Sequence, residues 1–153
     1  MRVIDFLKPD AIIADLQAKT KAGTLAELAT VMARLEPGVE AESLRRVLEE
    51  RELLASTAIG DGIAIPHGKL DAIGQLSGVL GRSRPGIEFE SIDGKPTHLV
   101  FMLVAPVSST GVHLKALARL SRLFRDSDFR ERLMAAPTRE VMYQVISDED
   151  AKY

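Results

Sequence analysis

The chain has 153 residues, of which 46% are hydrophobic and 27% charged, and this length supports one closed core better than two. We therefore expect a single domain that spans residues 1–153. Charges of both signs are interspersed and the formal net charge is −2, so no basic stripe offers itself to nucleic-acid phosphates, and nucleic acid is not an expected partner. The absence of cysteine excludes disulfides, thiolate metal sites and cysteine nucleophiles, and it fits a reducing compartment.

No stretch of the sequence is long and apolar enough to form a membrane-spanning helix. The longest apolar run covers residues 99–107, far below the ~20 residues that a membrane-spanning helix needs. The N-terminus also lacks the apolar region of a signal peptide. We expect a protein without membrane insertion that is located in the cytoplasm.

Two helices are predicted in the first third of the chain. The first covers residues 15–35, where Thr24 and Glu27 have the spacing of a capping box and apolar residues recur on one face. The second covers residues 41–53 and carries leucine and valine on one stripe. Extending that stripe by seven residues reaches Arg51, so we expect Arg51 near the core side of this helix.

The middle of the chain predicts strands. Residues 63–66, 75–80 and 96–105 are rich in apolar and β-branched residues, and the last of these runs is apolar almost throughout, as expected for a central strand covered on both faces. The Asp93-Gly94 pair before it is a strong turn signal. We therefore expect residues 87–92 to fold back beside this strand, which makes the sheet mixed.

The last third of the chain predicts helices again. Residues 108–111 supply a cap, and the helix that follows is expected to bury a stripe formed by Leu114, Leu117, Leu120 and Phe124. Two shorter helices are expected over residues 127–135 and 138–146, separated by Pro137. This order of elements predicts an α/β fold with a mixed sheet flanked by helices.

The three histidines come first among residues that could carry chemistry, because an uncharged imidazole can attack phosphorus at neutral pH. His67 follows Pro66 and precedes Gly68, which favours an exposed loop position; the competing interpretation is a surface histidine with no role. His113 falls in the first turn of a helix, beside free backbone N–H groups that suit a phosphate; alternatively it packs on the preceding strand. His98 begins the buried strand and is expected to be structural.

The charged residues give weaker signals. An arginine on an apolar helix face is costly unless it meets an anion, but Arg51 could also extend past its neighbours to solvent. No two histidines have the close spacing of a metal-binding segment, so no metal is expected. A further group is interpreted as a solvated surface without a role, and consists of Lys69, Asp71, Arg82 and Arg84.

The block from residue 51 to residue 69, RELLASTAIGDGIAIPHGK, resembles the signature of the enzyme IIA domain of the phosphoenolpyruvate-dependent phosphotransferase system, mannitol/fructose/nitrogen-regulatory type. Later landmarks of that family follow in the right order, namely PGIEF at residues 85–89, Asp93-Gly94, the apolar strand, and His113-Leu114 with Leu117. The resemblance covers most of the chain and is firmest over residues 51–146. It implies an α/β fold around a mixed sheet.

The resemblance also implies a phosphotransferase role as a phosphohistidine carrier. His67 would take a phosphoryl group from an HPr-type phosphocarrier protein, and His113 would face it and hydrogen-bond the phosphoryl oxygens. Arg51 would offset the added charge, and Thr57 would add a hydroxyl donor. Phosphoryl transfer needs alignment and charge compensation, so neither a metal nor a cofactor is implied.

The resemblance leaves two kinds of onward partner. Sugar-transporting relatives pass the phosphoryl group to a IIB domain, whereas the nitrogen-regulatory branch, which residues 56–69 resemble most, signals through regulatory target proteins. We favour the regulatory interpretation, with a stand-alone fructose- or mannitol-type enzyme IIA as the alternative. A binding module without phosphotransfer is a further possibility that intact Arg51, His67 and His113 argue against. Partner docking is expected on small and apolar residues around His67, such as Ile63, Ile65 and Gly68.

Overall fold

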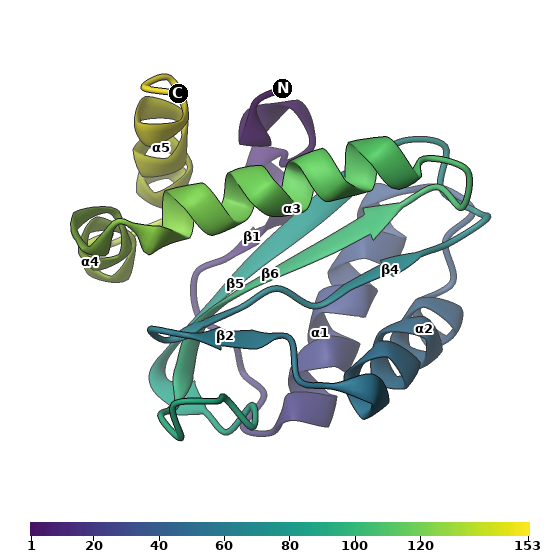
Figure 1. The fold of residues 1–153 in the computed structure, drawn as a ribbon, viewed down its shortest axis with the longest axis horizontal. Coiled ribbons are helices and arrows are strands. Elements are labelled where there is room, and N and C mark those ends of the chain that lie inside the picture. Colours follow the sequence, from purple (N-terminus) through teal and green to yellow (C-terminus); the bar gives the residue numbers. More distant parts are fainter.

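The computed structural model describes all 153 residues (Figure 1). Two 3₁₀ turns, Val3–Asp5 and Pro9–Ala11, come before the first strand. The elements that follow are β1 (Ile12–Ile13), α1 (Lys21–Leu35), α2 (Ala41–Leu54), β2 (Ala58–Gly60), β3 (Ile63–Ala64), β4 (His67–Lys69), β5 (Ser77–Ile87), β6 (Thr97–Ala105), α3 (Thr110–Arg125), α4 (Ser127–Ala135) and α5 (Arg139–Asp150).

The six strands form one mixed sheet, which confirms the predicted α/β class. Its order is β1-β5-β6-β3-β2, and β4 continues beside β6 beyond β3. β5 and β6 are antiparallel, whereas β3 and β4 run parallel to β6. The chain folds back before β6 as the turn signal at Asp93-Gly94 predicted, but of residues 87–92 only Ile87 pairs with β6, opposite Thr97, and the rest form the connecting loop.

Helices cover both faces of the sheet. In Figure 1, α3 crosses one face of β5 and β6, while α1 and α2 lie on the other face. α4 and α5 lie beyond one end of α3. Of the nine residues of β6, all except His98 are buried, because apolar side chains meet helices on either side. The central strand therefore fixes the positions of elements on both faces.

The first helix begins later than its sequence pattern predicts. α1 starts at Lys21, and its N-cap is Thr20, whose hydroxyl oxygen accepts the backbone N–H of Gly23. Thr24, the predicted cap, is buried inside the helix and donates its hydroxyl to the Thr20 carbonyl. Glu27 instead accepts backbone N–H groups of the segment before the helix. The capping-box prediction was wrong by one turn because Thr20 already occupies that role.

Other boundaries were predicted with mixed success. α2 and α4 agree with their predicted ranges to within one residue, while α5 continues to Asp150. β5 is longer than predicted and ends at Ile87. The strand predicted over residues 63–66 is only Ile63–Ala64, and the chain re-enters the sheet as β4. The two-residue β1 and the three-residue β2 are too short to give a pattern and were not predicted.

The buried stripe of α3 differs from the predicted one. Leu114 is 62% exposed and Leu117 is only partly buried. In the first two turns of α3, the buried positions come one residue before the predicted ones, at His113 and Ala116. The buried residues of the helix are His113, Ala116, Leu120, Leu123 and Phe124. The leucine pattern hid this because a histidine and an alanine occupy the first two buried positions.

Arg82 is the clearest correction among the charged residues. It was predicted on a solvated surface, but it is fully buried. Its Nε donates to the Ala14 carbonyl, and its Nη1 donates to the carbonyls of Leu133 and Ala136 at 2.8 and 2.6 Å. These last carbonyls lie at the C-terminal end of α4, where backbone acceptors are otherwise unpaired and carry partial negative charge. Arg82 therefore joins the sheet to α4.

None of the helices combines the length and the apolar character that crossing a membrane requires.

Candidate functional site

Two histidines meet near the end of the central strand. His67 is the first residue of β4 and lies beside Leu103 of β6. β6 ends at Ala105, and α3 begins five residues later and carries His113. The ring centroids of His67 and His113 are 5.4 Å apart, with the ring planes at 71°. The sheet and the helix that follows it thus bring together residues 46 positions apart in the sequence.

His67 is held more firmly than the predicted exposed loop would hold it. It belongs to a strand, is partly buried, and places its Nδ1 2.8 Å from the carbonyl oxygen of Ile65. A carbonyl only accepts, so Nδ1 carries the proton and Nε2 of the neutral ring keeps its lone pair. Burial lowers the pKa of His67, the Ile65 carbonyl opposes this, and Arg51 lowers it further. The ring is therefore neutral at pH 7, with Nε2 free to act as a nucleophile.

Gly68 allows α2 to approach His67 closely. A Cβ atom at this position would lie 2.7 Å from Cγ1 of Val47, closer than real contacts allow. The absence of a side chain therefore lets β4 and α2 pack together. Because the last turn of α2 carries Arg51, this contact also determines how near the arginine lies to His67.

His113 lies in the first turn of α3, as predicted. It is 7% exposed, and its Nε2 is buried without a hydrogen-bond partner. Burial lowers the pKa of His113, and the nearby His67 and Lys69 lower it further. Buried polar nitrogens are seldom left unpaired, so this one is suited to an oxygen bound beside it. The N-cap Ser109 makes no side-chain cap, which leaves the first N–H groups of α3 available to an anion.

Arg51 and Thr57 lie at the end of α2 and just before β2. Arg51 is half-buried, and its guanidinium turns to the helix end, where Nη1 donates to the Ala55 carbonyl at 2.9 Å. Its charge contributes to the lowered pKa of His67, so Arg51 acts on that ring electrostatically without a direct hydrogen bond to it. Thr57 is buried, and its hydroxyl donates to the carboxylate of Glu52. Donation from Thr57 to a phosphoryl oxygen stays a prediction.

Comparison with known proteins identifies the family. Residues 5–149 match the family model described as "Phosphoenolpyruvate-dependent sugar phosphotransferase system, EIIA 2". The chain belongs to this family. Members of the EIIA family act as carriers in phosphotransfer, and the predicted resemblance is thereby confirmed.

Individual relatives include both regulatory and sugar-specific proteins. The chain is 42% identical over 147 residues to a nitrogen regulatory protein of Bradyrhizobium diazoefficiens, a match that covers 96% of this chain and 95% of that protein. It is 33% identical over 150 residues to the fructose-specific EIIABC component of Bacillus subtilis, covering 98% of this chain and 24% of that longer protein. The crystal structure of nitrogen regulatory protein IIA-Ntr from Neisseria meningitidis superposes with a TM-score of 0.87 at 31% identity, covering 93% of this chain and 97% of that one.

The structure of this EIIA family member adds two charged residues: Glu52, which the sequence did not single out, and Lys69, which was interpreted as solvated surface without a role. Lys69 follows His67 by two positions in β4, which places both side chains on one face of the strand. Its Nζ lies 2.8 Å from the hydroxyl of Thr110, the first residue of α3. Glu52 accepts hydrogen bonds from the N–H and hydroxyl of Thr57. Residues two apart in a strand share a face, so a strand over residues 67–69 would have placed Lys69 beside His67. This was not inferred because three residues are too few to predict a strand.

The predicted docking surface needs correction. Ile63, in β3, and Ile65, just after it, are only 2% and 3% exposed because both side chains face the core. They therefore present no surface that a partner could contact. Exposed apolar side chains occur instead on the two helix ends that carry Arg51 and His113. They are Leu53 and Leu54 at the end of α2, and Val107, Val112 and Leu114 before and within the start of α3.

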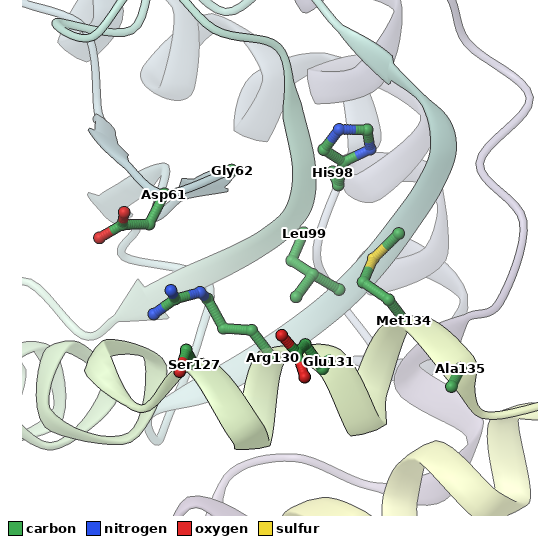
Figure 2. A pocket seen from close by; sticks show the side chains of 9 residues that line it. All are labelled: Asp61, Gly62, His98, Leu99, Ser127, Arg130, Glu131, Met134 and Ala135. Atoms are coloured by element: carbon green, nitrogen blue, oxygen red, sulfur yellow. The ribbon is translucent and has the colours of Figure 1, made fainter.

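The largest hollow of this EIIA chain lies away from the histidine pair. It has a volume of about 550 Å³ and lies between the start of β6 and α4, where Arg130 and Glu131 line it (Figure 2). His98 also lines it, five residues before Leu103, or about 17 Å along the strand. The Nδ1 atom of His98 lies 2.9 Å from the Ser83 carbonyl, in agreement with the predicted structural role.

Proposed function

We propose that this chain is a phosphocarrier of the phosphoenolpyruvate-dependent phosphotransferase system that accepts a phosphoryl group on Nε2 of His67. The observation that carries the proposal is the neutral His67 ring, with Nδ1 bonded to a carbonyl and Nε2 free, next to the unpartnered Nε2 of His113. The donor is an HPr-type phosphocarrier protein. The two rings lie side by side, so a nucleophile and a second polar nitrogen are positioned together, and phosphoryl transfer depends on positioning of this kind.

In this reaction the lone pair of His67 Nε2 forms the new bond to phosphorus. The bond between phosphorus and the donor's histidine nitrogen breaks, and its electron pair stays on the donor ring. The proton stays on Nδ1 of His67, where its hydrogen bond to the Ile65 carbonyl stabilises the ring as it gains positive character. Both sides of the exchange are phosphohistidines, so the free-energy change is small and the transfer is reversible.

The phosphoryl group brings two negative charges, and the surroundings of His67 compensate them. Arg51 supplies a guanidinium from α2, and Lys69 supplies an ammonium from β4. The N-terminus of α3 adds backbone N–H groups, and His113 donates from Nε2 when that nitrogen carries its proton. These groups are in place before transfer, so no metal ion is required for charge compensation.

We infer that the main output is nitrogen-regulatory signalling, in which target proteins distinguish the phosphorylated from the unphosphorylated form. The 42% identity to a nitrogen regulatory protein over nearly the full length of both chains supports this choice. The alternative is a fructose- or mannitol-type carrier that passes the group to a sugar-specific IIB domain, which the similarity to a fructose-specific EIIABC component favours. The exposed leucines beside Arg51 suit the docking of either partner.

Phosphorylation of purified protein by phosphoenolpyruvate, enzyme I and an HPr-type carrier tests the proposal. Intact mass should show one added phosphoryl group on the wild type and none on His67→Ala. His98→Asn is the matched control, because asparagine can still donate to the Ser83 carbonyl, and it should be phosphorylated normally. Labelling of His67→Ala, or no labelling of the wild type, would refute the proposal. Incubating the labelled protein with a fructose-specific IIB domain then separates the two outputs: rapid transfer supports the sugar-specific alternative.

A further inference from the structure

A nearly buried carboxylate lies next to Arg51 in the last turn of α2. The side chain of Glu52, the residue after Arg51, is only 6% exposed. One carboxylate oxygen lies 2.8 Å from Nζ of Lys21, the first residue of α1. Both oxygens lie 3.2 Å from the backbone nitrogen of Thr57, and the Thr57 hydroxyl donates to the same carboxylate. Glu52 therefore ties the start of α1, the last turn of α2 and the residue before β2 together.

The backbone that Glu52 fixes is the backbone that anchors Arg51. α2 ends at Leu54, and residues 55–57 connect it to β2. Arg51 donates to the carbonyl of Ala55 at the start of this connection, and Glu52 holds the N–H of Thr57 at its end. The two neighbouring side chains thus clamp a three-residue segment from both ends. Release of Thr57 would free Ala55 and, with it, the guanidinium.

The charge of Glu52 also reaches His67. Glu52 acts to raise the pKa of His67, against the effect of Arg51 and of burial. The other charged or titratable groups at the site are Lys69 from β4 and His113 from α3. Lys21 is the counter-ion of Glu52, and it also lies 3.4 Å from the exposed Glu90. Without Lys21, a nearly buried negative charge would stand uncompensated close to an incoming phosphoryl dianion.

We propose that Glu52, paired with Lys21, is a positioning residue of the phosphoryl site: it fixes Arg51 through Thr57 and the Ala55 carbonyl, and it sets how much negative charge His67 faces. The inference rests on the proposed phosphocarrier function. It assigns a functional consequence to an ion pair that does not itself touch the reacting atoms.

Substituting Glu52 and substituting Lys21 should shift the pKa of His67 in opposite directions. An ion pair that only stabilises the fold would not have this effect. Glu52→Gln keeps an acceptor for Thr57 but removes the negative charge, so the pKa of His67 should fall and the phosphorylated fraction at equilibrium with the donor should rise. Lys21→Met leaves Glu52 uncompensated, so the pKa of His67 should rise and the phosphorylated fraction should fall. Glu90→Gln leaves the pair intact and serves as the control. NMR titration of the imidazole nitrogens and intact mass measure the two quantities.

The positioning role has its own readout. Glu52→Ala releases Thr57, and the rate of phosphoryl gain in single-turnover mixing should fall about tenfold or more because Arg51 loses its fixed anchor. Glu52→Gln should recover most of that rate. Equal rates for Glu52→Ala and Glu90→Gln would overturn the positioning role. Shifts of the His67 pKa in the same direction for Glu52→Gln and Lys21→Met, or no shift in either, would overturn the charge-balancing role.

A failure of the proposed role of Glu52 can be distinguished from a failure of the proposed phosphocarrier function. The titration of His67 needs no phosphate, so it tests the effect of Glu52 even if the wild type accepts no phosphoryl group. Thermal unfolding identifies a variant that has lost its fold, and Lys21→Arg, which keeps the positive charge, should then restore the wild-type titration.

Discussion

Adding one methyl group at Gly68 should separate α2 from the sheet and carry Arg51 away from His67. The Cβ atom of Gly68→Ala would lie 2.7 Å from Cγ1 of Val47, about an ångström inside normal van der Waals contact. Val47 is β-branched, so its side chain has little freedom to rotate away, and the helix must move instead. Overpacking of this kind costs about 1–3 kcal/mol. At about 2–4 °C per kcal/mol for a chain of this size, the melting temperature should fall by roughly 2–12 °C.

Calorimetry and single-turnover phosphorylation measure the two consequences of Gly68→Ala. The phosphorylation rate should fall with stability, because the displaced helix carries the arginine. Gly74→Ala is the matched control, since a Cβ at Gly74 meets nothing within 4 Å and its backbone is not left-handed. Adding Val47→Ala to Gly68→Ala removes the clash and should recover both quantities, which a double-mutant cycle measures. Unchanged stability and rate in Gly68→Ala alone would refute this account of the contact.

Four further predictions concern His113, His67 and Arg82. His113→Ala should still fold but take up the phosphoryl group about 10²–10³-fold more slowly in single-turnover mixing, because one preorganised donor is lost; a rate near wild type would exclude such a donor role. Because burial lowers the pKa of His67, the uptake rate measured against pH should fall to half its plateau value at a pH below the usual imidazole value of 6.5. The same lowered pKa means that the folded state binds a proton less readily than the unfolded chain, so the His67 contribution to unfolding free energy should decrease as pH falls through 6.5. Arg82→Met should lower the unfolding free energy by about 2–4 kcal/mol in denaturant titration, because carbonyls of α4 lose their donor, while leaving phosphorylation intact.

The sequence predicted the parts of the fold that carry a long pattern. The apolar run of β6 identified the central strand, the turn at Asp93-Gly94 indicated that the chain folds back just before it, and a first-turn position identified the place of His113. Short elements escaped because two or three residues show no periodicity, and β4 is the case that matters. Without it, His67 was placed on an exposed loop.

Side-chain partners were the second source of error. Arg82 was interpreted as a surface residue because its charge suggests exposure, whereas the carbonyls that bury it come from residues about 50 positions away. Glu52 was passed over because an acidic residue in the last turn of a helix looks solvated, and its partner Lys21 lies on another helix. The pairing of Arg51, His67 and His113 in one site came from the resemblance to a family, not from spacing within this chain.

The ladder between β4 and β6 has a consequence for how long partners stay bound. Backbone hydrogen bonds flank His67 on both sides, from Leu103 N–H to the Pro66 carbonyl at 2.9 Å and from Leu70 N–H to the Ala105 carbonyl at 3.0 Å. These bonds order the backbone of His67, and the bond from Nδ1 to the Ile65 carbonyl orders its ring, so docking of a partner has little left to order there. A brief, weak complex is then sufficient for transfer. A carrier that must release each donor before meeting the next recipient gains speed from such short-lived contacts.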